Sequence, residues 1–80
     1  MKIQLLFFGI AKDLAGKSSI YYDVKENTTV ASLKANLITN YSGLKNSHEF
    51  AIALNEEYAD NEVVLKENDV VAIIPPVSGG

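Results

Sequence analysis

The sequence contains no cysteine and no tryptophan, and its 80 residues include a single histidine and only two prolines. Without thiols the chain cannot build a disulfide framework, a thiolate metal site or a cysteine nucleophile. Basic side chains are also scarce, because seven Lys and Arg oppose ten Asp and Glu and give a net charge of −3. We therefore expect no nucleic-acid partner, since such binding needs a basic face that displaces counterions from phosphates.

A long hydrophobic run is absent as well. The segment 3–11 follows a lysine, as in a signal peptide, but Gln4 interrupts it and no small-residue cleavage site follows. No segment reaches the roughly 20 apolar residues that span a bilayer. We expect a buried strand at this position, no membrane partner and a cytoplasmic protein.

What is present is the composition of one small globular domain, with 48% hydrophobic and 21% charged residues. Short apolar runs bounded by turn residues predict five extended segments. The continuous β-branched run at 70–74 predicts a central strand that is covered on both faces. The five segments are 3–8, 18–24, 50–54, a brief edge piece at 58–59, and 70–74.

One main helix is predicted between the second and third extended segments. An apolar stripe at spacings of three and four indicates it, and Thr28 or Thr29 offers an oxygen that caps its first turn. A separate single helical turn is expected at 11–15, ended by Gly16 in the left-handed conformation. The stripe consists of Val30, Leu33, Leu37 and Tyr41, is widened by Ile38, and ends near Gly43.

This order of elements predicts an α+β fold, a mixed sheet with one main helix across one face. It resembles the β-grasp of ubiquitin-like proteins, in which the first and last strands lie parallel at the centre of the sheet. We expect residues 1–76 to form this domain and residues 77–80 to form a flexible C-terminal Gly-Gly tail.

Side chains that could carry chemistry are few. Residues 15–18 imitate the end of a phosphate-binding loop, but Ala11 stands where that motif needs a glycine. His48 is isolated in a polar loop, where a solvated imidazole is the expected state. The acidic side chains between 56 and 62 lack the spacing of a calcium loop. We expect no metal site and no active site that is complete within this chain.

The C-terminal tail is chemically more specific. Pro75 and Pro76 fix φ and favour an extended path away from the sheet. Gly79 and Gly80 lack a Cβ, so this backbone can enter a narrow channel. A carboxylate at Gly80 would then be unhindered enough to attack a nucleotide phosphate in another protein's pocket. The alternative is an ordinary frayed terminus.

Short motifs along the whole chain support the specific interpretation. They are Leu6-Phe7-Phe8, Leu14-Ala15-Gly16, Thr29-Val30 with Leu33, Asn55, and the run from Asn68 to Pro75-Pro76-Val77-Ser78-Gly79-Gly80. Together they resemble the small subunit of molybdopterin synthase, the MoaD family of ubiquitin-like sulfur carriers. The Pro-Pro-Val-Ser-Gly-Gly ending is the most specific motif, because thiamine-pathway sulfur carriers share the Gly-Gly end but usually lack the proline pair.

The resemblance implies a sulfur-carrier cycle. An ATP-dependent, E1-like activating enzyme adenylates the carboxylate of Gly80, and a sulfur donor displaces AMP to leave a thiocarboxylate. The tail then enters the large catalytic subunit, where sulfur passes to precursor Z (cyclic pyranopterin monophosphate) in molybdenum cofactor biosynthesis. Two small and two large subunits form a heterotetramer. The carrier binds no permanent cofactor, and ATP is used by the activating enzyme. The implied site residues are Gly79 and Gly80 for the chemistry and Pro75, Pro76, Val77 and Ser78 for partner contact.

Strand parity independently predicts where the partner docks. Gln4 is polar, so even-numbered side chains of the first strand are expected to face away from the helix. A single helix covers one side of a sheet, which leaves an apolar patch on the other side. We expect Phe8, Tyr58 and Ile74 to form the core of that docking surface. The alternative is that they pack under loops.

Two positions depart from the family. The family often has arginine where this chain has Lys12, and the resemblance implies that this position helps to dock the activating enzyme. Lysine keeps the positive charge but lacks the planar guanidinium that can make two parallel hydrogen bonds to one carboxylate. The family favours glycine where this chain has Asn68, and asparagine tolerates the same left-handed backbone.

Other functions remain open. A ubiquitin-like protein modifier would share the activation chemistry but join Gly80 to lysines of target proteins. A thiamine-pathway sulfur carrier would share the thiocarboxylate. An interaction module with an inert tail would need neither.

Overall fold

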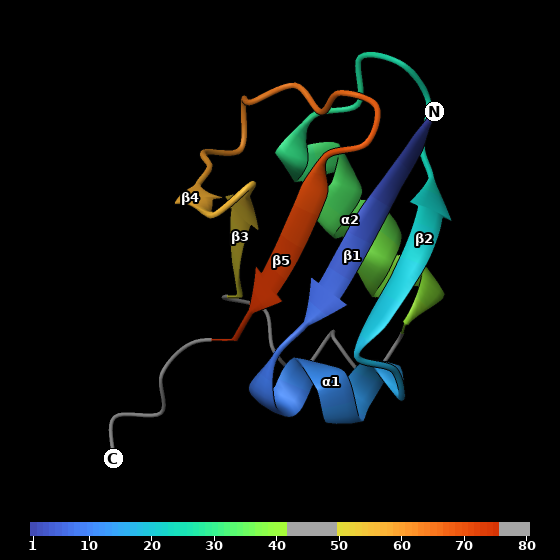
Figure 1. The fold of residues 1–80 in the computed structure, drawn as a ribbon, viewed down its shortest axis with the longest axis vertical. Coiled ribbons are helices and arrows are strands. Elements are labelled where there is room, and N and C mark those ends of the chain that lie inside the picture. The colour runs from blue at the N-terminus through green and yellow to red at the C-terminus, as the bar shows by residue number, and fades with distance from the viewer. Residues whose placement is uncertain (42–49, 76–80) are drawn as a thin grey trace.

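A five-stranded mixed sheet with a helix across one face forms the domain (Figure 1). The computed structural model describes residues 1–41 and 50–75. The strand order is β2-β1-β5-β3-β4. The predicted fold class is confirmed. The elements are β1 (Lys2–Phe7), α1 (Gly9–Ala15), β2 (Ser19–Asp23), α2 (Val30–Asn40), β3 (Ala51–Leu54), β4 (Glu57–Tyr58) and β5 (Val70–Ile74).

The first and last strands lie together in the interior of the sheet, as predicted. β1 and β5 are parallel, with Leu5 beside Val71. The flanking pairs β1–β2 and β5–β3 are antiparallel. Because side chains alternate along a strand, the odd-numbered residues of β1 and β5 all point to one face. Those residues are almost completely buried and build the centre of the core: Ile3, Leu5, Phe7, Val71 and Ile73.

Helix α2 covers that buried face (Figure 1). Thr29 is the N-cap, and its Oγ1 accepts a hydrogen bond from the backbone N–H of Ser32 at 3.2 Å, so the structure selects Thr29 over Thr28. The predicted stripe is buried at Val30, Leu33 and Leu37. Tyr41 follows the last helical residue and packs edge-on against Phe7, with ring centroids 5.8 Å apart. The predicted end near Gly43 lies outside the described residues.

The first helix is longer than the single turn predicted at 11–15. It begins at Gly9, and Ala11 is completely buried against the end of the sheet. The N-cap residue Phe8 makes no side-chain capping bond, so the sequence carries no polar capping residue that would mark this start. The predicted left-handed stop is confirmed, because Gly16 has φ 76° and donates its N–H to the carbonyl of Lys12.

The turn between β3 and β4 is shorter than the three residues, 55–57, that separate the predicted segments 50–54 and 58–59. Only Asn55 and Glu56 form it, with φ 49° and 76°, so β4 begins at Glu57 rather than at Tyr58. Positive φ at both central residues is the pattern of a type I′ hairpin turn, whose twist matches that of the strands it joins.

Burial of the helix stripe predicts the cost of truncating it. Leu33→Ala should lower the free energy of unfolding by about 2–5 kcal/mol, because it removes buried methyl groups and leaves a cavity. Leu33 is fully buried, whereas Asn36 on the exposed side of the helix is a matched control whose replacement by alanine should change stability by less than about 0.5 kcal/mol. Urea denaturation measures both. Equal losses would contradict the assignment of the buried face.

Candidate functional site

The face of the sheet opposite α2 carries exposed apolar side chains. Even-numbered residues of β1 and β5 point there, and from Gln4 onwards they are half-buried where their odd-numbered neighbours are buried. Phe8 is 49% exposed and Tyr58 is 78% exposed. Phe8 is thus exposed as strand parity predicts, and neither Phe8 nor Tyr58 packs under a described loop. Their role in docking stays a prediction. The prediction that β5 is covered on both faces is wrong for the described part of the chain, because α2 covers one face only.

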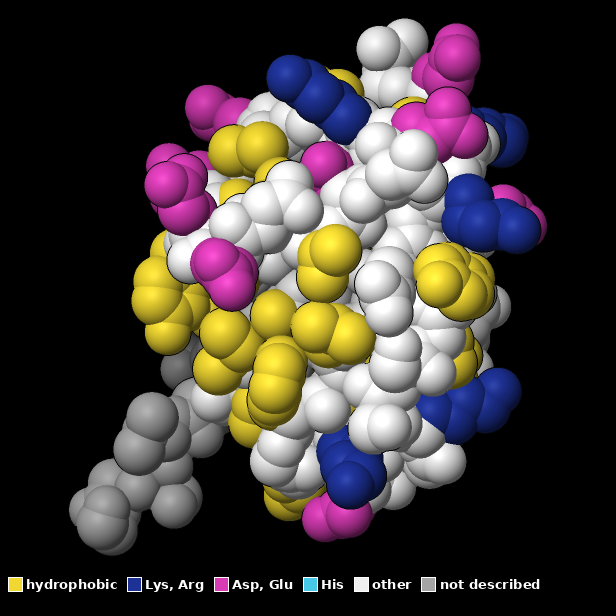
Figure 2. Space-filling view, viewed as in Figure 1, with side chains coloured by type: hydrophobic (Ala, Val, Ile, Leu, Met, Phe, Trp, Pro, Cys, Tyr) yellow, Lys and Arg dark blue, Asp and Glu magenta, His cyan; other side chains and the backbone are white. Residues whose placement is uncertain are grey.

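Seven of these side chains surround a hollow of about 350 Å³. We call this surface the apolar face. Figure 2 shows its side chains gathered over the end of β5. It brings together the three residues predicted to form a docking surface. The apolar face consists of Leu6, Phe8, Ala53, Tyr58, Val70, Ala72 and Ile74.

Strand register explains why the face is hollowed. Leu6 lies beside Ala72, Ala72 beside Ala53, and Ala53 beside Tyr58, so one row of side chains crosses four strands. From β1 to β4, the side chains of this row are large at Leu6, small at the two alanines and large at Tyr58. Because the two alanine side chains are short, the surface dips between Leu6 and Tyr58, and Ala53 at its floor is only 6% exposed. A protruding apolar side chain of a partner is the shape that such a dip accepts.

The end of β5, where the apolar face lies, is in contact with the start of α1. The N–H of Phe8 donates to the carbonyl of Ile73 at 3.2 Å. Gly9 has φ +53°, and a Cβ placed on it would approach Cγ of Pro75 to 3.3 Å. The bend at Gly9 thus lets Pro75 pack closely against the start of α1. Pro76, Val77, Ser78, Gly79 and Gly80, which the sequence predicts to contact partners or to react, lie outside the described residues.

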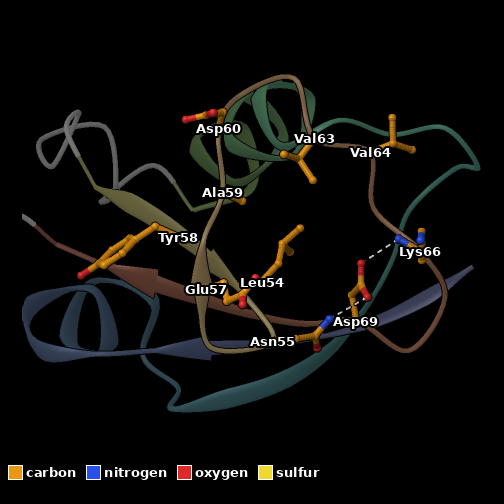
Figure 3. Close-up of a pocket in the computed structure, with 10 residues that line it drawn as sticks. All are labelled: Leu54, Asn55, Glu57, Tyr58, Ala59, Asp60, Val63, Val64, Lys66 and Asp69. Carbon is orange, nitrogen blue, oxygen red and sulfur yellow. Dashed lines mark hydrogen bonds between the residues drawn. The ribbon is translucent and has the colours of Figure 1, made fainter.

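A hydrogen-bonded clamp fixes the hairpin that carries Tyr58 to the start of β5 (Figure 3). Asn55 Nδ2 donates to Asp69 Oδ1 at 3.1 Å, and Asn55 Oδ1 accepts from the N–H of Val70 at 3.0 Å. Asp69 Oδ2 accepts from the N–H of Lys66 at 2.8 Å. The predicted left-handed conformation of Asn68 is confirmed, with φ 69°. The sequence indicates Asn55 as a turn residue and as part of the resemblance, but its bond to Asp69 was not predicted, since a side chain that bonds across a sheet leaves no local pattern.

The clamp borders a second hollow of about 360 Å³, whose lining mixes apolar and acidic side chains with Asn55 and Lys66 (Figure 3). Asp69 uses both carboxylate oxygens within the clamp. Among residues 1–41 and 50–75, no group of three or more His, Asp or Glu is arranged to hold a metal ion. The Asp69 carboxylate therefore serves to hold the clamp together, through both of its oxygens.

The other predicted residues lie apart from the apolar face. Lys12 is exposed on α1, next to Gly16 and Lys17, and it is not among the residues that line the hollow over Ala53 and Ala72. His48 lies outside the described residues. Neither helix of the described chain is long and apolar enough to cross a membrane.

Comparison with known proteins identifies the family. The sequence profile of the ThiS family matches residues 5–80. The chain belongs to the ThiS family. Curated relatives include the "Molybdopterin synthase sulfur carrier subunit" of Drosophila erecta, 34% identical over 83 residues that cover all of this chain and 92% of the relative. The protein of the same name from Dictyostelium discoideum is 35% identical, over 99% of this chain and 96% of the relative.

Solved structures of similar proteins share this ThiS-family architecture. In a protein–protein complex of subunits 1 and 2 of the molybdopterin-converting factor from Helicobacter pylori, a chain is 30% identical, with full coverage of both chains and a TM-score of 0.71. The Haloferax volcanii HVO 2177 protein is 27% identical with a TM-score of 0.88, over all of this chain and 87% of the other. Haloferax volcanii SAMP1, 22% identical over the full length of both chains with a TM-score of 0.86, shares the fold.

The clamp predicts a specific loss of stability. Asn55→Ala should lower the free energy of unfolding by about 1–3 kcal/mol, because it leaves the Val70 N–H and one Asp69 oxygen without their partner. Asn27 also has positive φ, 66°, and no described side-chain bond, so Asn27→Ala controls for the cost of alanine in a left-handed conformation. Chemical denaturation of both variants should show the larger loss for Asn55→Ala. Equal losses would mean that the clamp adds nothing.

Proposed function

We propose that this ThiS-family chain is a sulfur carrier subunit of molybdopterin synthase, which docks on the large catalytic subunit through its apolar face and presents sulfur on Gly80. The observation that carries the proposal is the position of the apolar face at the end of β5, directly before the tail. A partner bound at this face would lie close to Pro75, the described residue that precedes the tail in the sequence. The names of relatives 34% and 35% identical over nearly their whole length support the same function.

The proposed activation needs no catalytic side chain from the carrier. A carboxylate oxygen of Gly80 attacks the α-phosphorus of ATP on the activating enzyme, a P–O bond forms, and pyrophosphate leaves. The sulfur of a hydrosulfide-level donor then attacks the acyl carbon. A C–S bond forms, the C–O bond to the phosphate breaks, and AMP leaves with that oxygen. No atom changes oxidation state in these two steps, so ATP is the only energy source they need.

The proposed transfer occurs on the large subunit. The thiocarboxylate sulfur attacks an oxygen-bearing carbon of precursor Z (cyclic pyranopterin monophosphate), a C–S bond forms, and the C–O bond at that carbon breaks as its oxygen leaves as water. A second water then cleaves the acyl C–S bond, so sulfur stays on the pterin and the carboxylate of Gly80 returns. We propose the heterotetramer of two small and two large subunits as the working assembly. We place the cycle in the cytoplasm, where ATP is available to the activating enzyme, with which Lys12 makes contact.

The proposed chemistry changes the mass of the chain. Incubation with the activating enzyme, ATP and sulfide should increase the intact mass by the difference between sulfur and oxygen, and fragmentation should assign the increase to Gly80. A variant that lacks Gly80 is the control and should gain nothing.

Other results would support other functions. Isopeptide-linked lysine fragments in place of the sulfur adduct would identify a protein modifier. An unchanged mass with the cognate activating enzyme would contradict both functions and leave an interaction module.

The proposed docking surface predicts the effect of a charge at its centre. Phe8→Asp should weaken binding to the large subunit at least about tenfold, because it buries a carboxylate where an aromatic ring packed. The monomer should stay folded, since aspartate is a favoured N-cap residue and Phe8 is the N-cap of α1. Tyr21→Asp, on the edge strand β2 and 71% exposed, is the matched control. Calorimetric titration measures affinity, and circular dichroism checks the fold.

If Phe8→Asp unfolds the chain, Phe8 belongs to the core and its place in the docking surface is wrong. If both variants bind as the wild-type chain does, the docking surface lies elsewhere.

A further inference from the structure

One charged residue lies at the rim of the apolar face. Of the described residues that line the hollow, Glu56 alone carries a charge, and the other seven are apolar. Its side chain is exposed in the turn between β3 and β4. No described neighbour in the hollow therefore balances this carboxylate.

The backbone at this position does not favour glutamate. Glu56 is the second central residue of the two-residue turn and has φ 76°. Glycine is the residue favoured here, because a Cβ makes the left-handed conformation costly. Asn55, the first central residue, offsets its own cost through the clamp with Asp69 and Val70. Glu56 makes no described hydrogen bond that would offset the cost in the same way. A residue that is unfavourable for the fold and lines a binding surface is a candidate for a role in binding.

We infer that Glu56 selects the partner by charge: the large subunit presents an arginine to Glu56, next to the apolar side chain that fills the hollow over Ala53 and Ala72. This inference rests on the proposed function. Glu56 and Tyr58 line the same hollow, and Tyr58 is 78% exposed. A guanidinium can bind a carboxylate through two N–H groups and also stack on an aromatic ring, which an ammonium group does less well. Arginine is thus the cation that this pair of side chains fits best.

The chain itself cannot supply that residue. All seven of its basic side chains are lysines, and its net charge is −3. A second copy would therefore bring no arginine to Glu56 and would add like charge. Charge complementarity favours a different protein as the occupant of the apolar face.

The test measures affinity for the large subunit of the same organism and thermal stability in parallel. Glu56→Gln should weaken binding about tenfold. Glu56→Lys should weaken it further, because the new lysine and the partner's arginine are both positively charged and repel each other. Raising the salt concentration should weaken the wild-type complex more than the Glu56→Gln complex, since salt screens the charge pair. Glu57→Lys is the matched control, because Glu57 is the adjacent acidic residue but lines the other hollow. It should bind within about twofold of the wild-type chain.

Glu56→Gly separates binding from folding. It should raise the melting temperature, because glycine relieves the left-handed backbone, and it should still weaken binding to the same degree as Glu56→Gln. A purely structural role would change stability and leave affinity unchanged, which would overturn the inference. So would equal losses of affinity for Glu56→Lys and Glu57→Lys, or a self-associated wild-type chain that Glu56→Lys dissociates in sedimentation. Failure of the wild-type chain to bind the large subunit would instead contradict the proposed function.

Discussion

Parallel pairing of β1 with β5 inside a sheet that has one covering helix is the constraint from which the other features follow. Helix α2 buries the face of Leu5 and Val71, while β5 and the end of β1 are also apolar on the other face. The opposite face keeps its apolar side chains in contact with solvent, which monomeric proteins rarely tolerate without a binding role. The same pairing directs the end of β5 past α1, so the uncovered face and the root of the tail lie together.

Much of this arrangement is predictable from the sequence, because its causes are local. The alternation around Gln4 and Phe8 indicates which face of β1 is exposed, and the spacing of Val30, Leu33 and Leu37 indicates the buried stripe of the helix. The position of Gly16 correctly predicts where α1 ends. The fold class and the grouping of Phe8, Tyr58 and Ile74 follow from these patterns once a single helix is assigned to cover the sheet.

Features that depend on contacts between distant residues were not predictable. The clamp joins Asn55 to Asp69 and Val70 across the sheet, and no periodicity indicates such a bond. The start of α1 has no polar N-cap residue, so no capping pattern in the sequence indicates its first turn. The hollow depends on Ala53 and Ala72 being side by side, which requires the register of two strands. Glu56 became informative only when its φ and its position at the rim of the hollow were both known.

This chain has few reactive side chains. That is consistent with a carrier that docks on its partners and presents a reactive terminus to them, while the partners supply the catalytic groups. The most direct test is a single-turnover reaction of the large subunit and precursor Z with the chain bearing either a thiocarboxylate or a carboxylate at Gly80. We expect sulfur-containing pterin from the thiocarboxylate form alone, with return of the carboxylate form of the chain. Product from both forms, or from neither when the complex is formed, would contradict the role of Gly80 as the sulfur carrier.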